Sequence, residues 1–260
     1  MKVTIFSSNQ PRHLNLALEF SRVADQVFFV SEVNTVFPGQ IEDFFKTSEV
    51  MQTYFQKVIN SERNIFGDIR FLPNNVRTLI VKSGDLNKLD KIQIIEALNS
   101  DIYVVFGSSY IKGWLIDFLV EQRAINIHMG LSPYYRGSSC NFWALYDNNP
   151  SYVGATIHLL SKGLDSGPIL FHSMSKIKSN PFEYTMSTVK SAFHSIAERI
   201  DDKTIFNINP LLQNKTQEIR YSKNEHFTDN AIINFFKKKI DLFSKDFDAS
   251  LLKDAYYFFF

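Results

Sequence analysis

The chain has 260 residues, of which 45% are hydrophobic and 21% charged, as is usual for a globular protein. Its 28 basic and 27 acidic residues give a net charge of +1, so there is no overall electrostatic bias toward nucleic acid, although a local basic patch is compatible with that sum. Cys140 is the single cysteine, which excludes an internal disulfide and a cysteine-rich zinc site.

The sequence carries no signal that directs it to a membrane or out of the cell. Residues 1–8 turn polar too soon for a secretory signal peptide. No stretch approaches the roughly 18 consecutive apolar residues of a membrane span. We therefore expect a cytoplasmic protein without a membrane or nucleic-acid partner.

Strands and helices are predicted to alternate through the first half of the chain. Residues 2–6 form a short apolar strand, and Pro11 opens an amphipathic helix, because proline suits the first helical turn. The patterns then predict, in order, a strand over 27–30, a helix over 42–60, a strand over 78–81, a helix over about 87–99 and a strand over 102–106.

This alternation predicts an α/β fold, a doubly wound and mostly parallel sheet of Rossmann-like type. The run over 102–106 is continuously apolar, which is typical of a parallel strand covered on both faces. Ligands of such sheets bind beyond the carboxyl ends of the strands. The loops after residues 6, 106 and 127 are therefore the places where we expect a site.

The second half of the chain has a different character. Two strands are predicted over 153–160 and 168–176, joined by a turn over 161–167, and a helix follows over 182–200. Weaker helical patterns lead to an aromatic tail over 255–260. This tail could be disordered, docked on the domain or part of a dimer contact, and the sequence leaves these alternatives open.

No internal repeat and no linker rich in Pro, Gly or Ser divides the chain. We expect a catalytic domain over residues 1–180 and a small, mainly helical C-terminal extension over 181–260. The extension would contact the substrate or a second subunit of a homodimer.

Three polar side chains in the middle of the chain suit acyl transfer. Asn126 and His128 are two residues apart on an extended segment, so they emerge on the same face. Asp165 lies in a tight turn, and a carboxylate beside an imidazole orients it and favours its protonated form. An amide and an imidazole can stabilise a developing oxyanion, and a His–Asp pair can move protons between an attacking amine and its leaving group.

These residues stand within motifs that resemble those of the tetrahydrofolate-dependent formyltransferases. That family includes glycinamide ribonucleotide, methionyl-tRNA and sugar N-formyltransferases. The resemblance is strongest over about residues 102–172. It rests on three segments, which are Asn126-Ile127-His128, the loop Leu131-Ser132-Pro133-Tyr134-Tyr135-Arg136-Gly137, and the turn Leu164-Asp165-Ser166-Gly167-Pro168-Ile169. Met129-Gly130 departs from the Pro-Ser of many relatives, which we expect to reshape the loop without removing the chemistry.

The resemblance implies roles for these residues and 10-formyltetrahydrofolate as co-substrate, without a metal. Asn126 would hold and polarise the formyl oxygen, His128 would stabilise the oxyanion and assist proton transfer, and Asp165 would set the charge of His128 and relay protons. The carrier would bind between the loop after the fourth strand and the later turn, at Phe106, Gly107, Ser108, Ser109, Tyr110, Leu164 and Asp165.

Other polar residues are interpreted from their positions in the chain. His158 could support the site or be a hydrogen-bonded structural histidine, and the sequence does not decide between them. Arg136 is expected to fasten its own loop, and Cys140 to pack at the start of a helix. The segment after the first strand could receive an anionic substrate at a helix N-terminus, through Asn9, Gln10 and Arg12.

The acceptor implied by the resemblance is the primary amine of an amino sugar, attached to a nucleotide, in a surface-polysaccharide pathway. Fewer than ninety residues follow the motifs, and they lack the short regular strands of the barrel that methionyl-tRNA formyltransferases usually add. The glycine-rich phosphate loop of glycinamide ribonucleotide relatives is missing after the first strand. Formyltetrahydrofolate deformylases share the core motifs but usually add an N-terminal regulatory domain. Because this sequence opens with the first predicted strand, we expect transfer of the formyl group and not its hydrolysis.

Three alternatives remain beside this hypothesis. The acceptor could be another amine, such as that of methionyl-tRNA or a peptide. The chain could instead be a non-catalytic scaffold that binds folate or a nucleotide. A nicotinamide-dependent oxidoreductase is disfavoured, because no Gly-x-Gly-x-x-Gly follows the first strand.

Overall fold

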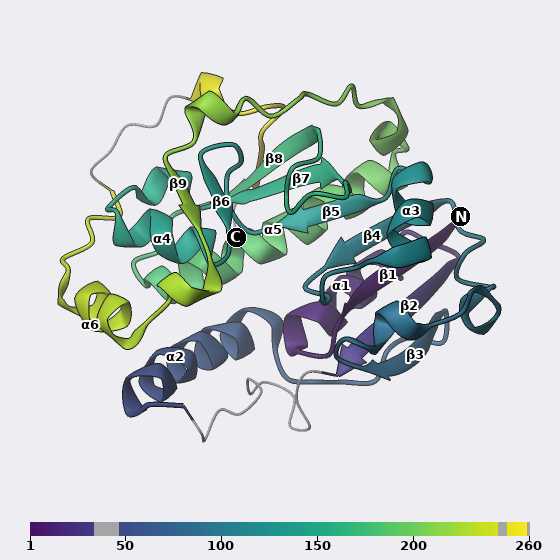
Figure 1. Cartoon of the computed structure of the whole chain (residues 1–260), viewed down its shortest axis with the longest axis horizontal. Coiled ribbons are helices and arrows are strands. Elements are labelled where there is room, and N and C mark those ends of the chain that lie inside the picture. Colours follow the sequence, from purple (N-terminus) through teal and green to yellow (C-terminus); the bar gives the residue numbers. More distant parts are fainter. Residues whose placement is uncertain (34–46, 244–248, 259–260) are drawn as a thin grey trace.

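An eight-stranded sheet forms the centre of the protein in a computed structural model, which describes residues 1–33, 47–243 and 249–258 (Figure 1). The strands lie side by side in the order β10-β8-β7-β5-β4-β1-β2-β3. They are β1 (Lys2–Ser8), β2 (Gln26–Val33), β3 (Val76–Lys82), β4 (Ile102–Phe106), β5 (Ile125–His128), β7 (Ala155–Leu159), β8 (Ile169–Ser175) and β10 (Tyr256–Phe258).

The sheet is mostly parallel and doubly wound. Neighbouring strands are parallel, except that β7 runs antiparallel to both β5 and β8. Strand β1 lies next to β4, and the chain winds outward from this pair in both directions. The loops after β1 and β4 diverge at this point, which is where open α/β sheets bind ligands. The predicted fold class is therefore confirmed.

Helices cover both faces of the sheet (Figure 1). The α-helices are α1 (Pro11–Phe20), α2 (Glu49–Phe66), α3 (Gly113–Glu121), α4 (Cys140–Tyr146), α5 (Pro181–Asp201) and α6 (Asp229–Lys237). The 3₁₀ helices are η2 (Asp85–Lys88), η3 (Lys91–Ile94), η4 (Pro150–Tyr152), η5 (Thr204–Asn207), η6 (Lys215–Gln217), η7 (Asn224–His226) and η8 (Ala249–Leu251).

The core on the two faces follows from the alternation of side chains along each strand. On β4, Ile102, Val104 and Phe106 join the core that α1 and α5 cover. Tyr103 and Val105 point the other way, into the core beneath α3, η2 and η3. Because both faces of the strand are buried, its sequence is a continuous apolar run.

Most predicted elements are present with small differences in their bounds. The strands predicted over 2–6, 27–30, 78–81, 102–106, 153–160 and 168–176 correspond to β1, β2, β3, β4, β7 and β8. The helix predicted over 182–200 is α5. The helix predicted over 42–60 corresponds to α2, of which the structure describes residues from Glu49 onward, while 42–46 lie outside the described residues.

The helix predicted over 87–99 is wrong. The segment forms η2, η3 and turns, because the backbone is extended at Leu89 and Asp90 between the two 3₁₀ helices. The carbonyl of Leu89 accepts a hydrogen bond from the Trp114 indole at 2.9 Å, and the backbone N–H of Asp90 donates to the Gln93 side chain at 2.7 Å. Both bonds hold the chain in a conformation that a continuous helix does not allow.

The C-terminal part of the chain packs on the sheet. Helix α5 shares one core with the strands through residues such as Phe193 and Ile196. The aromatic tail, whose place the sequence left open, docks as β10 in parallel with β8, with Tyr256 opposite Ser173. The guanidinium of Arg199 lies 5.5 Å from the Tyr256 ring and helps to hold it. The division after residue 180 stays a prediction.

A second sheet joins the loop after β5 to a distant segment. Its strands are β6 (Tyr135–Gly137) and β9 (Arg220–Ser222), which run in parallel. Arg136 forms an ion pair with Glu218 at 2.9 Å, so this arginine fastens its own loop, as predicted. Gly137 has a φ of +90°, and a Cβ atom placed there would lie 1.9 Å from the carbonyl oxygen of Ser222.

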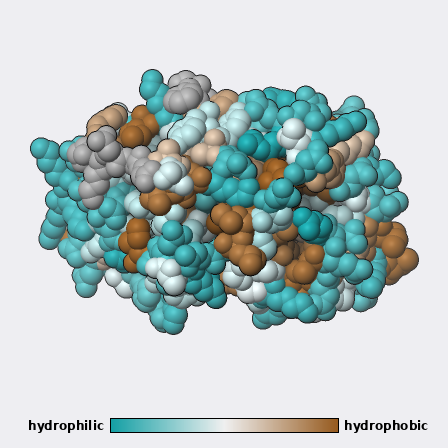
Figure 2. All heavy atoms as spheres, turned by 90° about the horizontal axis from the view of Figure 1, so that it is seen from above, coloured by the Kyte–Doolittle hydropathy of each residue, from teal (hydrophilic) through white to brown (hydrophobic). Residues whose placement is uncertain are grey.

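The face shown in Figure 2 is mainly hydrophilic. Apolar side chains gather in the middle of the face shown and at its right-hand end. Individual large apolar residues with high exposure include Phe71, Ile80, Ile92 and Leu212. Within the described residues, no helix combines the length and the apolar character needed to cross a membrane.

Gly84 and Gly137 have similar backbone conformations, so together they make a matched test of the close approach of β9 to Gly137. Gly84 has a φ of +86° but nothing within 4 Å of an added Cβ. We expect Gly84→Ala to lower the free energy of unfolding by about 1 kcal/mol, from backbone strain alone. Gly137→Ala should cost about 3 kcal/mol or more, because a backbone oxygen of β9 must also move. Urea denaturation measures both, and equal losses would contradict the close approach of β9.

Candidate active site

Strands β5 and β7 bring three polar side chains to one place. Asn126 on β5 lies opposite His158 on β7, and His128 lies opposite Thr156, because the two strands pair in antiparallel register. The side chain of Ile127, between Asn126 and His128, points into the core and is 4% exposed. The register of one strand pair therefore places an amide and two imidazoles together.

Asp165 reaches these residues from a tight turn between β7 and β8. Its own φ is +44°, in the left-handed region that few residues other than glycine adopt. The turn lies close to β7, since a Cβ at Gly167 would lie 1.7 Å from the Leu159 carbonyl oxygen. The side-chain amide of Gln213 donates to the carbonyls of Asp165 and Gly167 at 2.9 and 2.8 Å. A residue of the C-terminal segment thus fixes the turn.

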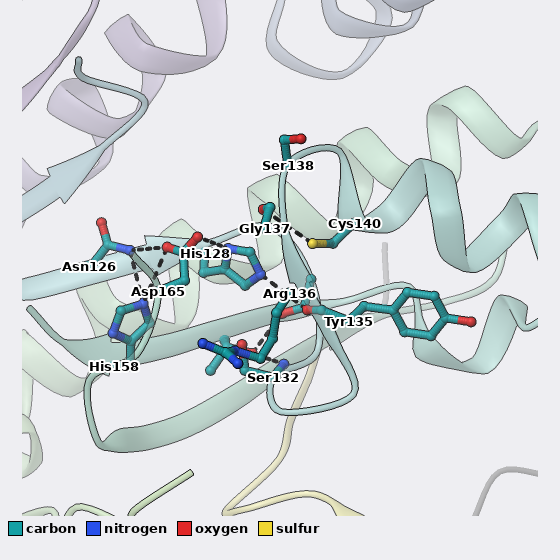
Figure 3. Close-up of polar contacts among 12 residues, drawn as sticks. Asn126, His128, Ser132, Tyr135, Arg136, Gly137, Ser138, Cys140, His158 and Asp165 are labelled. Carbon is teal, nitrogen blue, oxygen red and sulfur yellow. Dashed lines mark hydrogen bonds and ion pairs between the residues drawn. The ribbon is translucent and has the colours of Figure 1, made fainter. Parts of the chain in front are cut away.

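The three residues predicted for catalysis meet at this point (Figure 3). The Nδ1 atom of His128 lies 3.3 Å from Oδ2 of Asp165. The Nδ2 atom of Asn126 lies 3.3 Å from Oδ1 of the same carboxylate. The structure therefore brings together side chains from two segments that are almost forty residues apart in sequence.

His158 is in contact with the same cluster through Asn126. Its Nδ1 lies 2.8 Å from the carbonyl oxygen of Leu159, so Nδ1 carries the proton. In the neutral ring, Nε2 is then an acceptor, and it lies 3.0 Å from Nδ2 of Asn126. Both N–H groups of the Asn126 amide are thus engaged, one by His158 and one by Asp165.

The protonation states of His128 and Asp165 depend on their burial and on the short distance between them. Burial alone would lower the pKa of His128, which is 6% exposed, but the carboxylate of Asp165 outweighs this and holds the pKa well above its ordinary value. Burial would likewise raise the pKa of Asp165, but the His128 imidazolium outweighs this and holds it well below its ordinary value. The site therefore contains an imidazolium–carboxylate pair at neutral pH.

The loop after β5 is held by buried neighbours that the sequence did not single out. The hydroxyl of Thr156 donates to the Gly130 carbonyl at 2.6 Å and accepts from the Ser132 N–H at 2.8 Å. Nε2 of His172 donates to the Ser132 carbonyl at 2.9 Å, and burial lowers the pKa of this histidine to about 4. His172 is thus a neutral structural residue.

A small cavity of about 230 Å³ opens beside Asn126 and Asp165. Most residues predicted to bind the carrier line it, namely Gly107, Ser108, Ser109, Tyr110, Leu164 and Asp165. The side chain of Phe106, also predicted to bind the carrier, turns away and packs against the rings of His13 and Phe193 at 5.1 Å. Tyr110 and Leu164 are 54% and 53% exposed at the cavity.

Glu32, at the end of β2, anchors the loop that lines this cavity and was missed by the sequence analysis. Its carboxylate is fully buried and accepts hydrogen bonds from the backbone N–H and the hydroxyl of Ser109, and from the backbone N–H of Gly84 at 2.8 Å. A charged residue inside the apolar run of β2 was the available signal. A buried carboxylate needs several donors, and the loop supplies them.

A larger cavity of about 470 Å³, here called the aromatic chamber, lies beside the small one. Its lining comprises Arg12, Tyr54, Phe55, Val58, Phe106, Met129, Ser139, Cys140, Asn141, Phe142, Leu145, Pro181, Phe182, Thr185, Met186, Val189, Asn224, Phe227 and Phe235. Cys140 is at the start of α4, as predicted. The chamber itself was not predicted, because its walls come from α2, α4, α5 and the C-terminal segment.

Of the three residues predicted to bind the substrate, only Arg12 lines the aromatic chamber. Its guanidinium forms an ion pair at 3.0 Å with Glu62, whose side chain is 3% exposed. Gln10 lies at the start of α1, where its backbone N–H donates to Nδ1 of His13 at 3.3 Å. Asn9 and Gln10 line neither of the two cavities. Among the described residues there is no group of His, Cys, Asp and Glu suited to hold a metal ion.

Comparison with known proteins places this fold and site in a family. The model of the formyl transferase family matches residues 1–200. The methionyl-tRNA formyltransferase of Thermotoga neapolitana is 29% identical over 119 residues, which cover 43% of this chain and 37% of that protein. That of Borrelia hermsii is 30% identical over 156 residues, covering 52% and 49%. The matches thus span less than half the length of these curated relatives.

Solved structures share the fold over most of the chain. A 4-N formyltransferase from Francisella tularensis has a TM-score of 0.54 at 19% identity, covering 87% of this chain and 77% of that one. An N-formyltransferase from Helicobacter canadensis, in complex with folinic acid and dTDP-3-aminofucose, has a TM-score of 0.52 at 14% identity, covering 91% and 81%.

The fold and the site define a Rossmann-like α/β protein with an Asn–His–Asp cluster beyond the carboxyl ends of its central strands. The match over residues 1–200 shows that the chain belongs to the formyl transferase family.

The Asp165→Asn variant tests whether the Asp165 carboxylate raises the pKa of the buried His128. Without the carboxylate, the largest influence that raises the pKa of His128 is lost while burial still lowers it, so we expect this pKa to fall from well above 6.5. Titration of the histidine ring protons by NMR measures this, with the exposed His226 as internal reference. In the wild type, the raised pKa stabilises the fold fully below pH 6.5, and this contribution is lost as the pH rises through the folded-state pKa. A His128 titration that does not move would contradict the pairing.

A second variant tests whether Glu32 anchors the loop after β4. Glu32→Gln replaces one acceptor oxygen by an NH₂ group that faces the backbone N–H of either Ser109 or Gly84, because these two donate to different oxygens. We expect a loss of about 1–3 kcal/mol in the free energy of unfolding, together with faster hydrogen exchange over residues 107–110. Glu225→Gln, at a side chain that is 70% exposed, is the control and should change neither.

Proposed function

We propose that the protein transfers a formyl group from 10-formyltetrahydrofolate to the primary amine of an amino sugar that is attached to a nucleotide. The observation that carries this proposal is the meeting of Asn126, His128 and Asp165 between two neighbouring cavities. One cavity suits the formyl carrier and the other suits the acceptor. Membership of the formyl transferase family supports the reaction class.

The small cavity has the character that a pterin ring needs. A planar heteroaromatic ring requires apolar walls for its faces and hydrogen-bonding groups for its edge. Val105, Ile111, Ile116 and Leu160 supply the walls, and the backbone around Gly107 and Gly163 brings polar groups to the rim. The bound carrier would supply an activated formyl group next to Asn126.

The side chains around the formyl group would then act as follows. His128, held as an imidazolium by Asp165, donates from Nε2 to the formyl oxygen as negative charge builds up there, in exchange for its 3.4 Å contact with the Tyr135 carbonyl. Asn126 adds a second donor by exchanging its 3.3 Å contact with Asp165 for the formyl oxygen, while His158 keeps hold of the other N–H. Each donor thus gives up one weak contact when the substrate binds.

The reaction also requires one proton to move. The acceptor nitrogen loses a proton as it forms the new C–N bond, and the carrier nitrogen gains one as its own C–N bond breaks. Asp165 contacts both Asn126 and His128, and therefore lies where it can accept the first proton and return it through His128. No nucleophilic serine or cysteine is required, because the amine is the nucleophile.

Two findings bear on the acceptor. The solved structures that share the fold over most of this chain include one described as a sugar N-formyltransferase and one described as a likely sugar N-formyltransferase. The curated relatives are methionyl-tRNA formyltransferases, but they match about half of the chain or less. We therefore propose an amino sugar, as in surface-polysaccharide biosynthesis, and keep methionyl-tRNA as the second candidate.

A screen of acceptors tests this function. Purified protein is incubated with 10-formyltetrahydrofolate and a panel that includes dTDP-3-aminofucose, other amino-sugar nucleotides and methionyl-tRNA, and products are read by mass for one added CO. We expect an amino-sugar nucleotide to be formylated. His128→Ala should reduce the rate by about 100-fold or more with the fold retained, because it removes the oxyanion donor. His226→Ala, at an exposed histidine, should keep full activity. Full activity of His128→Ala would sink the proposed mechanism.

A further inference from the structure

The aromatic chamber has the size and lining of a small-molecule site. Its volume of about 470 Å³ falls within the range of roughly 300–1,000 Å³ that such sites occupy. Aromatic rings dominate its walls, namely Tyr54, Phe55, Phe106, Phe142, Phe182, Phe227 and Phe235. Sites of this kind bind the flat or apolar faces of rings and use a few polar groups to orient them.

Tyr54 supplies an unsatisfied polar group in this lining. Its ring lies within 6.3 Å of six other aromatic rings, those of Phe55, Phe142, Phe182, Phe227, Phe235 and Phe236. The side chain is 9% exposed, and burial raises its pKa. Within the described residues, its hydroxyl makes no hydrogen bond. The hydroxyl is not among the buried polar atoms that lack a partner, so it reaches the open space of the chamber, where a bound molecule can form a hydrogen bond with it.

The charges of the side chains that line the aromatic chamber indicate which charge a bound molecule carries there. Among the described residues of the lining, Arg12 is the one charged side chain, and its ion pair with the buried Glu62 compensates it. The other polar side chains of the lining are neutral, namely Tyr54, Ser139, Cys140, Asn141, Thr185 and Asn224. The aromatic chamber therefore suits a neutral ring with hydroxyl groups and apolar faces, and an anionic part of the same molecule would lie outside it.

The position of the aromatic chamber relates it to the reacting atoms. On β4, Phe106 lines the chamber and the next residue, Gly107, lines the small cavity. On β5 and just after it, Ile127 lines the small cavity and Met129 lines the chamber. His128 is 6% exposed and lines neither cavity, but its ring lies beside Asp165 of the small cavity and beside Cys140 of the chamber. A molecule in each cavity would thus lie on a different side of His128.

We infer that the aromatic chamber binds the sugar ring of the acceptor, and that the Tyr54 hydroxyl forms a hydrogen bond with a hydroxyl group of that ring. This inference rests on the proposed function and names the site of its second substrate. The amine would face His128, and transfer would be direct between two molecules bound together. The methionyl end of a charged tRNA is the rival occupant, and the test below separates the two.

The principal variant is Tyr54→Phe, which keeps the ring and removes the hydroxyl. Binding is measured by calorimetry without turnover, with dTDP-3-aminofucose as the acceptor probe and folinic acid as the carrier probe. We expect Tyr54→Phe to lower the affinity for the acceptor probe by about 2- to 12-fold, which is the usual effect of losing one hydrogen bond. The affinity for folinic acid should not change. The melting temperature should stay the same or rise, because the hydroxyl leaves no partner behind.

A second variant blocks the aromatic chamber. Thr185 lies in the lining on α5 and is partly exposed, so Thr185→Trp should fill the space, abolish binding of the acceptor probe and spare folinic acid. Tyr221→Phe is the matched control, since this tyrosine is 44% exposed and lines neither cavity. It should leave both affinities unchanged.

The outcomes separate the inference from the function on which it rests. Wild-type affinity for the acceptor probe in both Tyr54→Phe and Thr185→Trp would overturn the inference, as would a wild-type chain that does not bind this probe. Loss of methionyl-tRNA binding in Thr185→Trp, with no binding of the sugar nucleotide, would assign the aromatic chamber to the rival. If the probe binds as expected but no member of the acceptor panel is formylated, the proposed function fails and the chamber remains a sugar site.

Discussion

The contact between the Asp165 carboxylate and the buried His128 imidazole is the interaction on which the site depends. Burial by itself would neutralise both groups, and only their separation of 3.3 Å keeps them charged. The same carboxylate reaches Asn126, and His158 holds the other amide N–H. The charge of the imidazole and the orientation of the amide are therefore set by one carboxylate, and movement of its turn would alter both.

Distant parts of the chain hold that carboxylate and its surroundings in place. Gln213 fixes the turn of Asp165 from the C-terminal segment, and Glu32 fixes the loop after β4 from the end of β2. The β6–β9 sheet fastens the loop after β5, and the tail docks as β10 on the edge of the main sheet. Residues that follow the helix α5 thus contribute to the geometry of a site whose reactive groups all lie before it.

Several features could be predicted because they depend on local pattern. Continuous apolar runs indicated β1, β2 and β4, and the spacing of Asn126 and His128 on an extended segment placed both on one face. Residues 87–99 were wrongly predicted as a helix, because their apolar spacing is helical while long-range bonds to Leu89 interrupt it. Asn9 and Gln10 were expected at the substrate because they follow β1, but they line neither cavity.

The sequence by itself determined the fold class, the family resemblance and the identity of the three polar residues, because period, order and motif spacing are properties of the chain alone. The tertiary structure decided which neighbours these residues have. It placed His158 opposite Asn126, buried Glu32 beneath the loop after β4, and enclosed a chamber between α2, α4, α5 and the C-terminal segment. Such contacts join segments far apart in sequence, and their formation depends on packing that no local pattern records.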